Sequence, residues 1–87
     1  MQKVTEAPVI VSFQRVQVRR TRWVKLLGLV NCGPGFSGMP GVVNGFSDLV
    51  LELWGDAGRH ARSAIGVAEL PFDIPVEVEA IVEITGG

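Results

Sequence analysis

The sequence predicts a small α+β domain, with one helix lying on one face of a β-sheet. Residues 76–84 alternate between apolar and mostly acidic positions, which is typical of a strand with one buried face. Residues 42–53 instead repeat apolar side chains at helical spacing. Pro40 stands just before them, where the first turn of a helix accepts proline.

Length and composition restrict the class of protein. The 87 residues suffice for one core, and we treat residues 1–87 as a single domain. Hydrophobic residues make up 47% of the chain and its mean hydropathy is +0.34, more apolar material than so small a core hides, so we expect packed subunits. No apolar run approaches the ~20 residues of a membrane span and no signal-peptide pattern opens the chain, which predicts a cytoplasmic protein without a membrane partner.

Three segments precede the predicted helix. Residues 8–18 are rich in β-branched side chains and predict a strand or a hairpin. Residues 23–30 are apolar at nearly every position, which predicts a strand covered on both faces. Residues 31–41 hold four glycines and two prolines and predict a loop.

Two strands are expected after the helix, which we predict to end at Gly55 and Gly58. Residues 63–68 predict a short strand with small residues on one face. In the strand at residues 76–84, the side chains expected on the buried face are Val76, Val78, Ala80, Val82 and Ile84.

Charge is distributed unevenly along the chain. Residues 1–25 carry a net charge of +5, whereas residues 26–87 carry −6. A basic arm can contact nucleic acid, but strand edges commonly carry arginine and lysine as well. We favour the solvated edge and do not expect a nucleic-acid partner.

A glycine pattern in the loop resembles a nucleotide-binding motif. Gly33, Gly35 and Gly38 match G-x-G-x-x-G after a strand. A dinucleotide site needs a helix that begins inside this pattern, and Pro34 and Pro40 delay the helix. The chain is also too short for a doubly wound fold, so we do not expect a nucleotide cofactor.

Cys32 is the only cysteine and His60 the only histidine of the chain. This composition excludes an internal disulfide, a zinc site of several thiolates and a histidine-rich metal site. Cys32 would need a neighbouring base or positive field to act as a nucleophile, and nothing in the sequence places His60 beside it. We therefore expect a spectator thiol and no bound metal.

Arginine and glutamate side chains are the remaining candidates for a site. Arg62 stands at the entrance of a predicted strand, where it can bind a carboxylate through two N–H groups or merely offset a helix dipole. Glu77 and Glu79 lie two residues apart on one strand face, so about 7 Å separates their Cα atoms. These carboxylates are either a solvated face, which the spacing favours, or include a general base.

Residues 22–84 resemble the C-terminal half of the RidA (YjgF-type) family, whose members are often labelled endoribonuclease L-PSP. The resemblance begins with VKLLGLVNCGPGF and PGVVNGFSDLVLELWG. Its most specific part extends from Arg62 to Ile81, with R-S-A-I-G-V-A-x-L-P followed by V-E-V-E-A-I. Residues 1–21 match no part of the family pattern and form a divergent basic segment.

The resemblance implies a chorismate mutase-like fold and a homotrimer with ligand clefts between subunits. It also implies hydrolysis of reactive enamines and imines, such as 2-iminobutanoate, to 2-keto acids and ammonia without a cofactor. In that chemistry the arginine that grips the substrate carboxylate matches Arg62, and the water-orienting glutamate matches Glu77. A cleft asparagine matches Asn44, and Glu79 is a further candidate for substrate binding.

Several departures from the family keep alternatives open. A tyrosine and a serine that the family supplies from its N-terminal half have no counterpart, and the chain contains no tyrosine. Some members carry a reactive cysteine where this chain has Ala64. The alternative functions are a catalytically incomplete trimer that binds 2-keto acids and, less favoured, an RNA-binding or RNA-cleaving protein.

Overall fold

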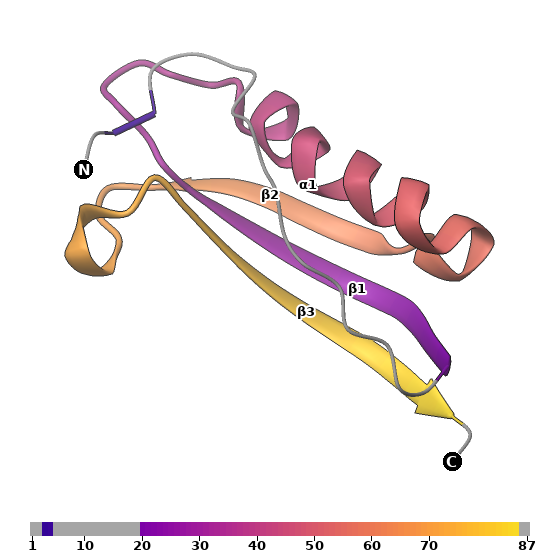
Figure 1. Cartoon of the computed structure of the whole chain (residues 1–87). Helices are drawn as coiled ribbons and strands as arrows, with labels where there is room; N and C mark the ends of the chain where they lie inside the picture. The colour runs from indigo at the N-terminus through magenta and orange to yellow at the C-terminus, as the bar shows by residue number, and fades with distance from the viewer. Residues whose placement is uncertain (1–2, 5–19, 86–87) are drawn as a thin grey trace.

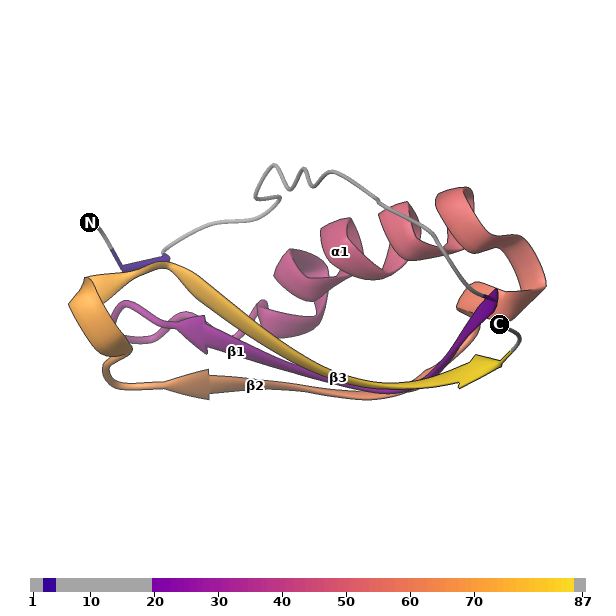
Figure 2. The same cartoon turned by 60° about the horizontal axis from the view of Figure 1, so that its bottom comes forward.

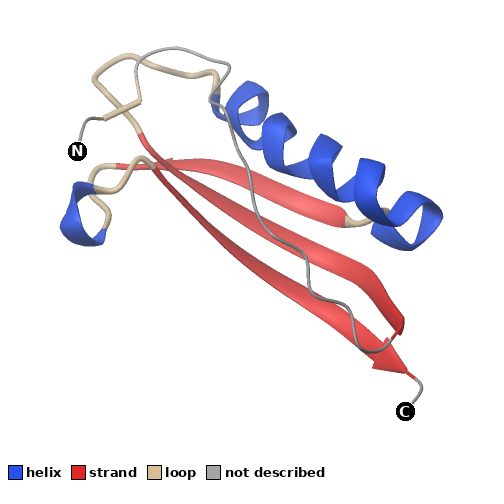
Figure 3. Cartoon of the chain, viewed as in Figure 1, coloured by secondary structure: helices blue, strands red, loops and turns tan. Residues whose placement is uncertain are grey.

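The computed structural model describes residues 3–4 and 20–85 of the chain. Its elements are drawn in Figure 1 and coloured by type in Figure 3. In chain order they are β1 (Arg20–Asn31), α1 (Met39–Trp54), the 3-10 turn η1 (Gly55–Gly58), β2 (Ala61–Val67), the 3-10 turn η2 (Pro71–Asp73) and β3 (Val76–Thr85). The strand or hairpin predicted over residues 8–18 lies outside the described residues.

The described strands form one mixed sheet in the order β2-β1-β3. β1 pairs in parallel with β2, to which α1 connects it, and antiparallel with β3. α1 lies on one face of this sheet, as Figure 2 shows from the side. The small α+β architecture with a helix on one face is therefore confirmed.

The core lies where α1 packs on the central strand. Leu26 and Val30 of β1 are fully enclosed, as are Val42 and Val43 of α1. A Cβ added at Gly28, between the two β1 residues, would lie 2.6 Å from a methyl group of Val43. The helix can approach β1 this closely because position 28 has no side chain.

The helix begins and ends near the predicted positions. α1 starts at Met39 with Pro40 in its first turn, and Gly55 caps its C-terminus. Gly38 precedes the helix, so the whole G-x-G-x-x-G pattern lies in the loop, as the two prolines predicted. Within the described residues, no helix is both long and apolar enough to cross a membrane.

The predicted burial of β3 is correct for only part of the strand. Val76 and Val78 pack against the core, but Ala80 is exposed, and Val82 and Ile84 are 37% and 54% exposed. The reason is that α1 lies over β1 and β2 (Figure 1), so no described element covers this half of β3.

The strand at residues 23–30 is predicted to be covered on both faces, and within the described part of this single chain only one face is covered. α1 covers one face, on which Leu26 lies, whereas no described element covers the other. Leu27 and Leu29 point to that open face and are half-buried, because β1 is the central strand and flanking side chains shield them. Ile65 and Ile81 lie on the same face and are exposed.

The buried side-chain amide of Asn31, at the end of β1, connects this strand to the turn before β3. Asn31 is fully buried and donates to the Asp73 carboxylate at 2.8 Å and to the Ile74 carbonyl at 3.0 Å. Its Oδ1 accepts a hydrogen bond from Lys3 Nζ at 2.7 Å. Asp73 and its neighbour Phe72 have positive φ angles of 54° and 56°, which non-glycine residues rarely adopt, so the Asn31 contacts hold a strained turn in place.

We predict that Gly28→Ala lowers the free energy of unfolding by about 1–3 kcal/mol, because the new methyl group meets Val43. Alanine is otherwise preferred to glycine inside a strand, so a loss of stability would report this contact alone. Chemical denaturation measures the effect. The double variant Gly28→Ala/Val43→Ala should show a coupling between the two sites, and strictly additive losses would contradict the close approach.

Candidate functional site

The candidate site lies between the first turns of α1 and the start of β2. Arg62 is the second residue of β2 and pairs with Leu26, whose side chain faces α1, so Arg62 also points toward the helix. Asn44 and Ser47 lie three residues apart on α1 and therefore share one helix face. The structure thus brings together Arg62 and Asn44, two of the predicted site residues.

Arg62 donates hydrogen bonds to three neutral oxygen atoms. Its Nη2 lies 2.6 Å from Asn44 Oδ1 and 3.4 Å from the Pro40 carbonyl oxygen, and its Nη1 lies 3.1 Å from Ser47 Oγ. The side chain is half-buried, and no carboxylate of the described residues pairs with it. A guanidinium removed in part from water without a negative partner favours an anionic ligand.

His60 extends this group of polar side chains. Its Nε2 lies 3.0 Å from Ser47 Oγ and its Nδ1 lies 2.6 Å from the Gly58 carbonyl oxygen. The imidazole also packs beside the Trp23 indole, with 6.3 Å between ring centroids. Sequence reasoning considered His60 only as a partner for Cys32 and missed Ser47. A signal for Ser47 was present, because it interrupts the apolar helix stripe that includes Val43 and Val50.

These side chains line a cavity of about 590 Å³, a size that suits a small organic ligand. Among the described residues, its walls carry two arginines and further hydrogen-bond donors but no acidic group. The lining residues are Asn44, Ser47, Leu51, Arg59, His60 and Arg62. Arg59 is at the exposed rim, where it pairs with Asp56 at 3.2 Å.

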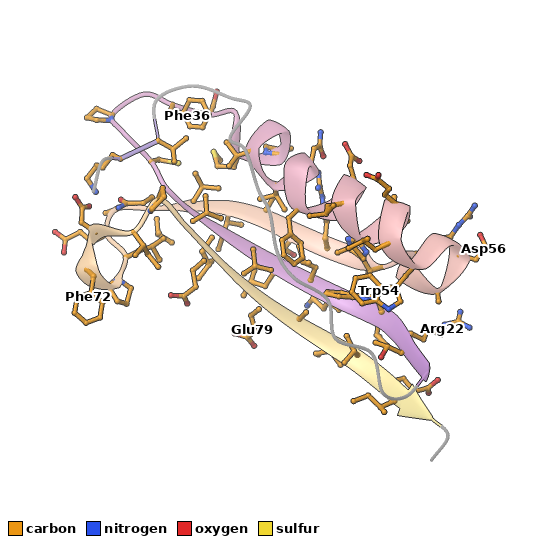
Figure 4. The ribbon with its side chains drawn as sticks, viewed as in Figure 1. Arg22, Phe36, Trp54, Asp56, Phe72 and Glu79 are labelled. Carbon is orange, nitrogen blue, oxygen red and sulfur yellow. The ribbon has the colours of Figure 1, made fainter. Side chains whose placement is uncertain are left out.

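Glu77 and Glu79 lie on the opposite face of the sheet from Arg62. They pair with Leu29 and Leu27 of β1, which point away from α1. The neighbouring Val76 and Val78 point the other way and pack on the core. Figure 4 shows Glu79 directed away from the helix. One chain therefore does not bring these carboxylates to the Arg62 cavity.

Cys32 follows β1 and lies beside the last residue of β2, far from the cavity at the start of that strand. Its backbone N–H binds the carbonyl of Val67, the last residue of β2, whereas His60 precedes the first residue of that strand. The expectation that His60 does not sit beside Cys32 is confirmed. Ala64, which stands where some RidA-type proteins carry a reactive cysteine, packs against the core.

Comparison with known proteins supports the likeness found in the sequence. No family model matches the chain. Protein TCP17 of Trypanosoma cruzi is 52% identical over 67 residues, which cover 76% of this chain and 42% of that protein. The crystal structure of protein Atu1372 from Agrobacterium tumefaciens, of unknown function, is similar with a TM-score of 0.72 and 48% identity, covering 74% of this chain and 40% of that one.

A proposed endoribonuclease from Shewanella oneidensis MR-1 has a similar crystal structure. The TM-score is 0.62 and the identity 32%, over 66% of this chain and 38% of the other. The resemblance to the RidA (YjgF-type) family is confirmed. The chain spans about two fifths of the length of these relatives. It shares with the Shewanella oneidensis structure an α+β fold of strands backed by a helix.

We predict that Arg62→Met changes the free energy of unfolding by no more than about 1 kcal/mol. The substitution removes a positive charge that has no described carboxylate partner, and Ser47 keeps its contact with His60. Chemical denaturation of both proteins measures the difference. A loss of several kcal/mol would instead make Arg62 a structural residue.

Proposed function

We propose that this chain contributes to a RidA-type site that hydrolyses reactive enamines and imines, such as 2-iminobutanoate, to 2-keto acids and ammonia. The observation that carries the proposal is Arg62. Its guanidinium is half-buried, and its partners among the described residues are neutral oxygens. The described lining of its cavity includes no acidic side chain. A 2-imino acid offers the carboxylate that such a group binds through paired charge-assisted hydrogen bonds.

The reaction itself requires little beyond position and a proton acceptor. Arg62 holds the carboxylate, which places the neighbouring C=N carbon in the cavity. A water oxygen bonds to that carbon while a carboxylate, assigned to Glu77 by the family resemblance, accepts the water proton. Glu77 passes that proton to the nitrogen. The new hydroxyl group then gives up its own proton, which the nitrogen gains, as the C=O bond forms and the C–N bond breaks, which leaves a 2-keto acid and ammonia. Proximity and orientation suffice for so labile a bond, and no cofactor takes part.

The opposite orientations of Arg62 and Glu77 support a cleft built by two subunits. Because the two side chains lie on different faces of one sheet, Arg62 would meet Glu77 of the partner subunit. The open sheet face carries Leu27, Leu29 and Ile65, which packing against another copy would bury. We therefore propose the homotrimer that the family resemblance implies, with each cleft between neighbours.

A 2-keto acid-binding protein without turnover is the second candidate. Ala64 in place of a reactive cysteine and the absence of tyrosine from the chain favour it. Arg62 and Asn44 alone would still hold the carboxylate of a 2-keto acid. The assay below separates the two functions.

The test uses 2-iminobutanoate that a second, amino-acid-consuming enzyme releases in the assay. The measured quantity is the acceleration of 2-oxobutanoate formation by this chain. Arg62→Met should lower kcat/KM by about 10–100-fold, the contribution of a charge-assisted hydrogen-bonded contact. Arg22→Met, which removes an exposed arginine outside the cavity, is the matched control and should keep full activity. Full activity in Arg62→Met would refute the assignment. If neither protein turns over but 2-oxobutanoate stabilises the unaltered chain against heat, the binding function stands instead.

Mixed oligomers test the shared cleft. Arg62→Met and Glu77→Gln should each lose at least nine tenths of the activity when tested alone. If Arg62 works with Glu77 of the partner subunit, randomly mixed trimers would contain intact clefts, about a quarter of all clefts formed. Activity should therefore reappear when the two variants are unfolded and refolded together, and light scattering should report the mass of a trimer. No recovery in mixed trimers would contradict a cleft formed from two chains.

A further inference from the structure

Ser47 and His60 have no part in the hydrolysis described above, although both line the Arg62 cavity. Ser47 is 7% exposed and its hydroxyl touches both other groups, Arg62 on one side and His60 on the other. These two side chains are therefore connected to Arg62 through one continuous series of hydrogen bonds.

Hydrogen-bond chemistry fixes the direction of every contact in this series. The Gly58 carbonyl can only accept, so Nδ1 of His60 carries the hydrogen. In the neutral imidazole Nε2 is then the acceptor, and the Ser47 hydroxyl donates to it. The Ser47 oxygen is left with its lone pairs, and the Arg62 guanidinium donates to one of them.

In a charged His60 the hydrogen bond between Nε2 and Ser47 would run in the opposite direction. An imidazolium would donate from Nε2 to the same Ser47 oxygen that already accepts from Arg62, and would place two positive charges on either side of one hydroxyl. The described cavity walls hold no carboxylate to offset them, and the remaining charged lining group is Arg59, which pairs with Asp56. The tautomer with its hydrogen on Nδ1 avoids this placement of like charges and satisfies both ring contacts.

The surroundings hold the imidazole in this orientation. A Cβ at Gly58 would lie 2.7 Å from the Val50 carbonyl oxygen, so η1 packs directly on α1 and fixes the carbonyl that His60 binds. On its other side the ring packs beside Trp23. Trp23 faces the helix because β1 shifts register between Trp23 and Lys25, which turns the preceding residues over.

We propose that Ser47 and His60 are positioning residues that set the orientation of the Arg62 guanidinium. His60 directs the Ser47 hydroxyl hydrogen away from Arg62, so that the serine oxygen and Asn44 Oδ1 hold the guanidinium from two directions. The other N–H groups of the Arg62 guanidinium are then preoriented for the carboxylate of the ligand. The inference rests on the proposed carboxylate site and adds residues that determine how tightly this site binds.

Nitrogen NMR of the histidine ring tests the direction of the contacts without any ligand. The chain contains one histidine, so a single pair of ring-nitrogen signals reports His60 without ambiguity. We expect the hydrogen on Nδ1 and an unprotonated, hydrogen-bonded Nε2. In Ser47→Ala the Nε2 signal should move to the value of an acceptor without a donor. A ring protonated on Nε2 at neutral pH would overturn the inference, whatever the ligand results.

Binding of 2-oxobutanoate, measured by calorimetry, tests the consequence for the site. Ser47→Ala should weaken binding about 5-fold, the effect of removing one neutral hydrogen bond, and Ser47→Thr should restore it by returning the hydroxyl. His60→Gln keeps an acceptor for Ser47 and should bind more tightly than His60→Leu, which does not. Ser37→Ala, an exposed serine outside the cavity, is the control and should bind as the unaltered chain does.

The outcomes separate this inference from the proposed function. In turnover of 2-iminobutanoate, Ser47→Ala should raise KM more than it lowers kcat, because the carboxylate contact exists before and during the reaction. Unchanged binding and KM in Ser47→Ala, with Arg62→Met defective, would overturn the positioning role and leave the proposed function standing. If the unaltered chain binds no 2-oxobutanoate, both the carboxylate site and the positioning role built on it are refuted.

Discussion

The close contact between α1 and β1 is the constraint on which the rest of the structure depends. Gly28 lets Val43 approach the strand, and the enclosed side chains of Leu26 and Val30 lie on either side of this point. The same packing sets the height of α1 above β2. It thereby brings the polar atoms on its first turns within hydrogen-bond distance of Arg62. The cavity is thus a consequence of how the apolar core packs.

Arg62 keeps its positive charge in this cavity although no described residue offers it a carboxylate partner. Arg62 is held by an amide, a hydroxyl and a backbone carbonyl, all neutral. By contrast, the exposed Arg59 has a carboxylate beside it in Asp56. A half-buried guanidinium with neutral partners is oriented without being neutralised, and this is the property required of a group that binds an anion. The aromatic and histidine contacts behind it supply rigidity rather than charge.

The secondary structure could be predicted because its signals are local. The spacing of apolar residues gave α1 and the three described strands, and Pro40 and Gly55 marked the helix ends where the structure has them. Alternation in β3 also separated Val76 from Glu77 correctly. What it could not give is how far α1 extends over the sheet, and so Val82 and Ile84 are exposed on a face that the pattern alone predicted to be buried.

The sequence by itself determined which elements form and which candidate side chains they carry, because periodicity, caps and motif spacing are properties of neighbouring residues. Only the tertiary structure decided that Arg62 meets Asn44, Ser47 and His60, and that Glu77 faces the other way. Strand register, the irregularity beside Trp23 and the approach of α1 join residues far apart along the chain. Such contacts depend on how whole elements pack, and a local pattern holds no information about that packing.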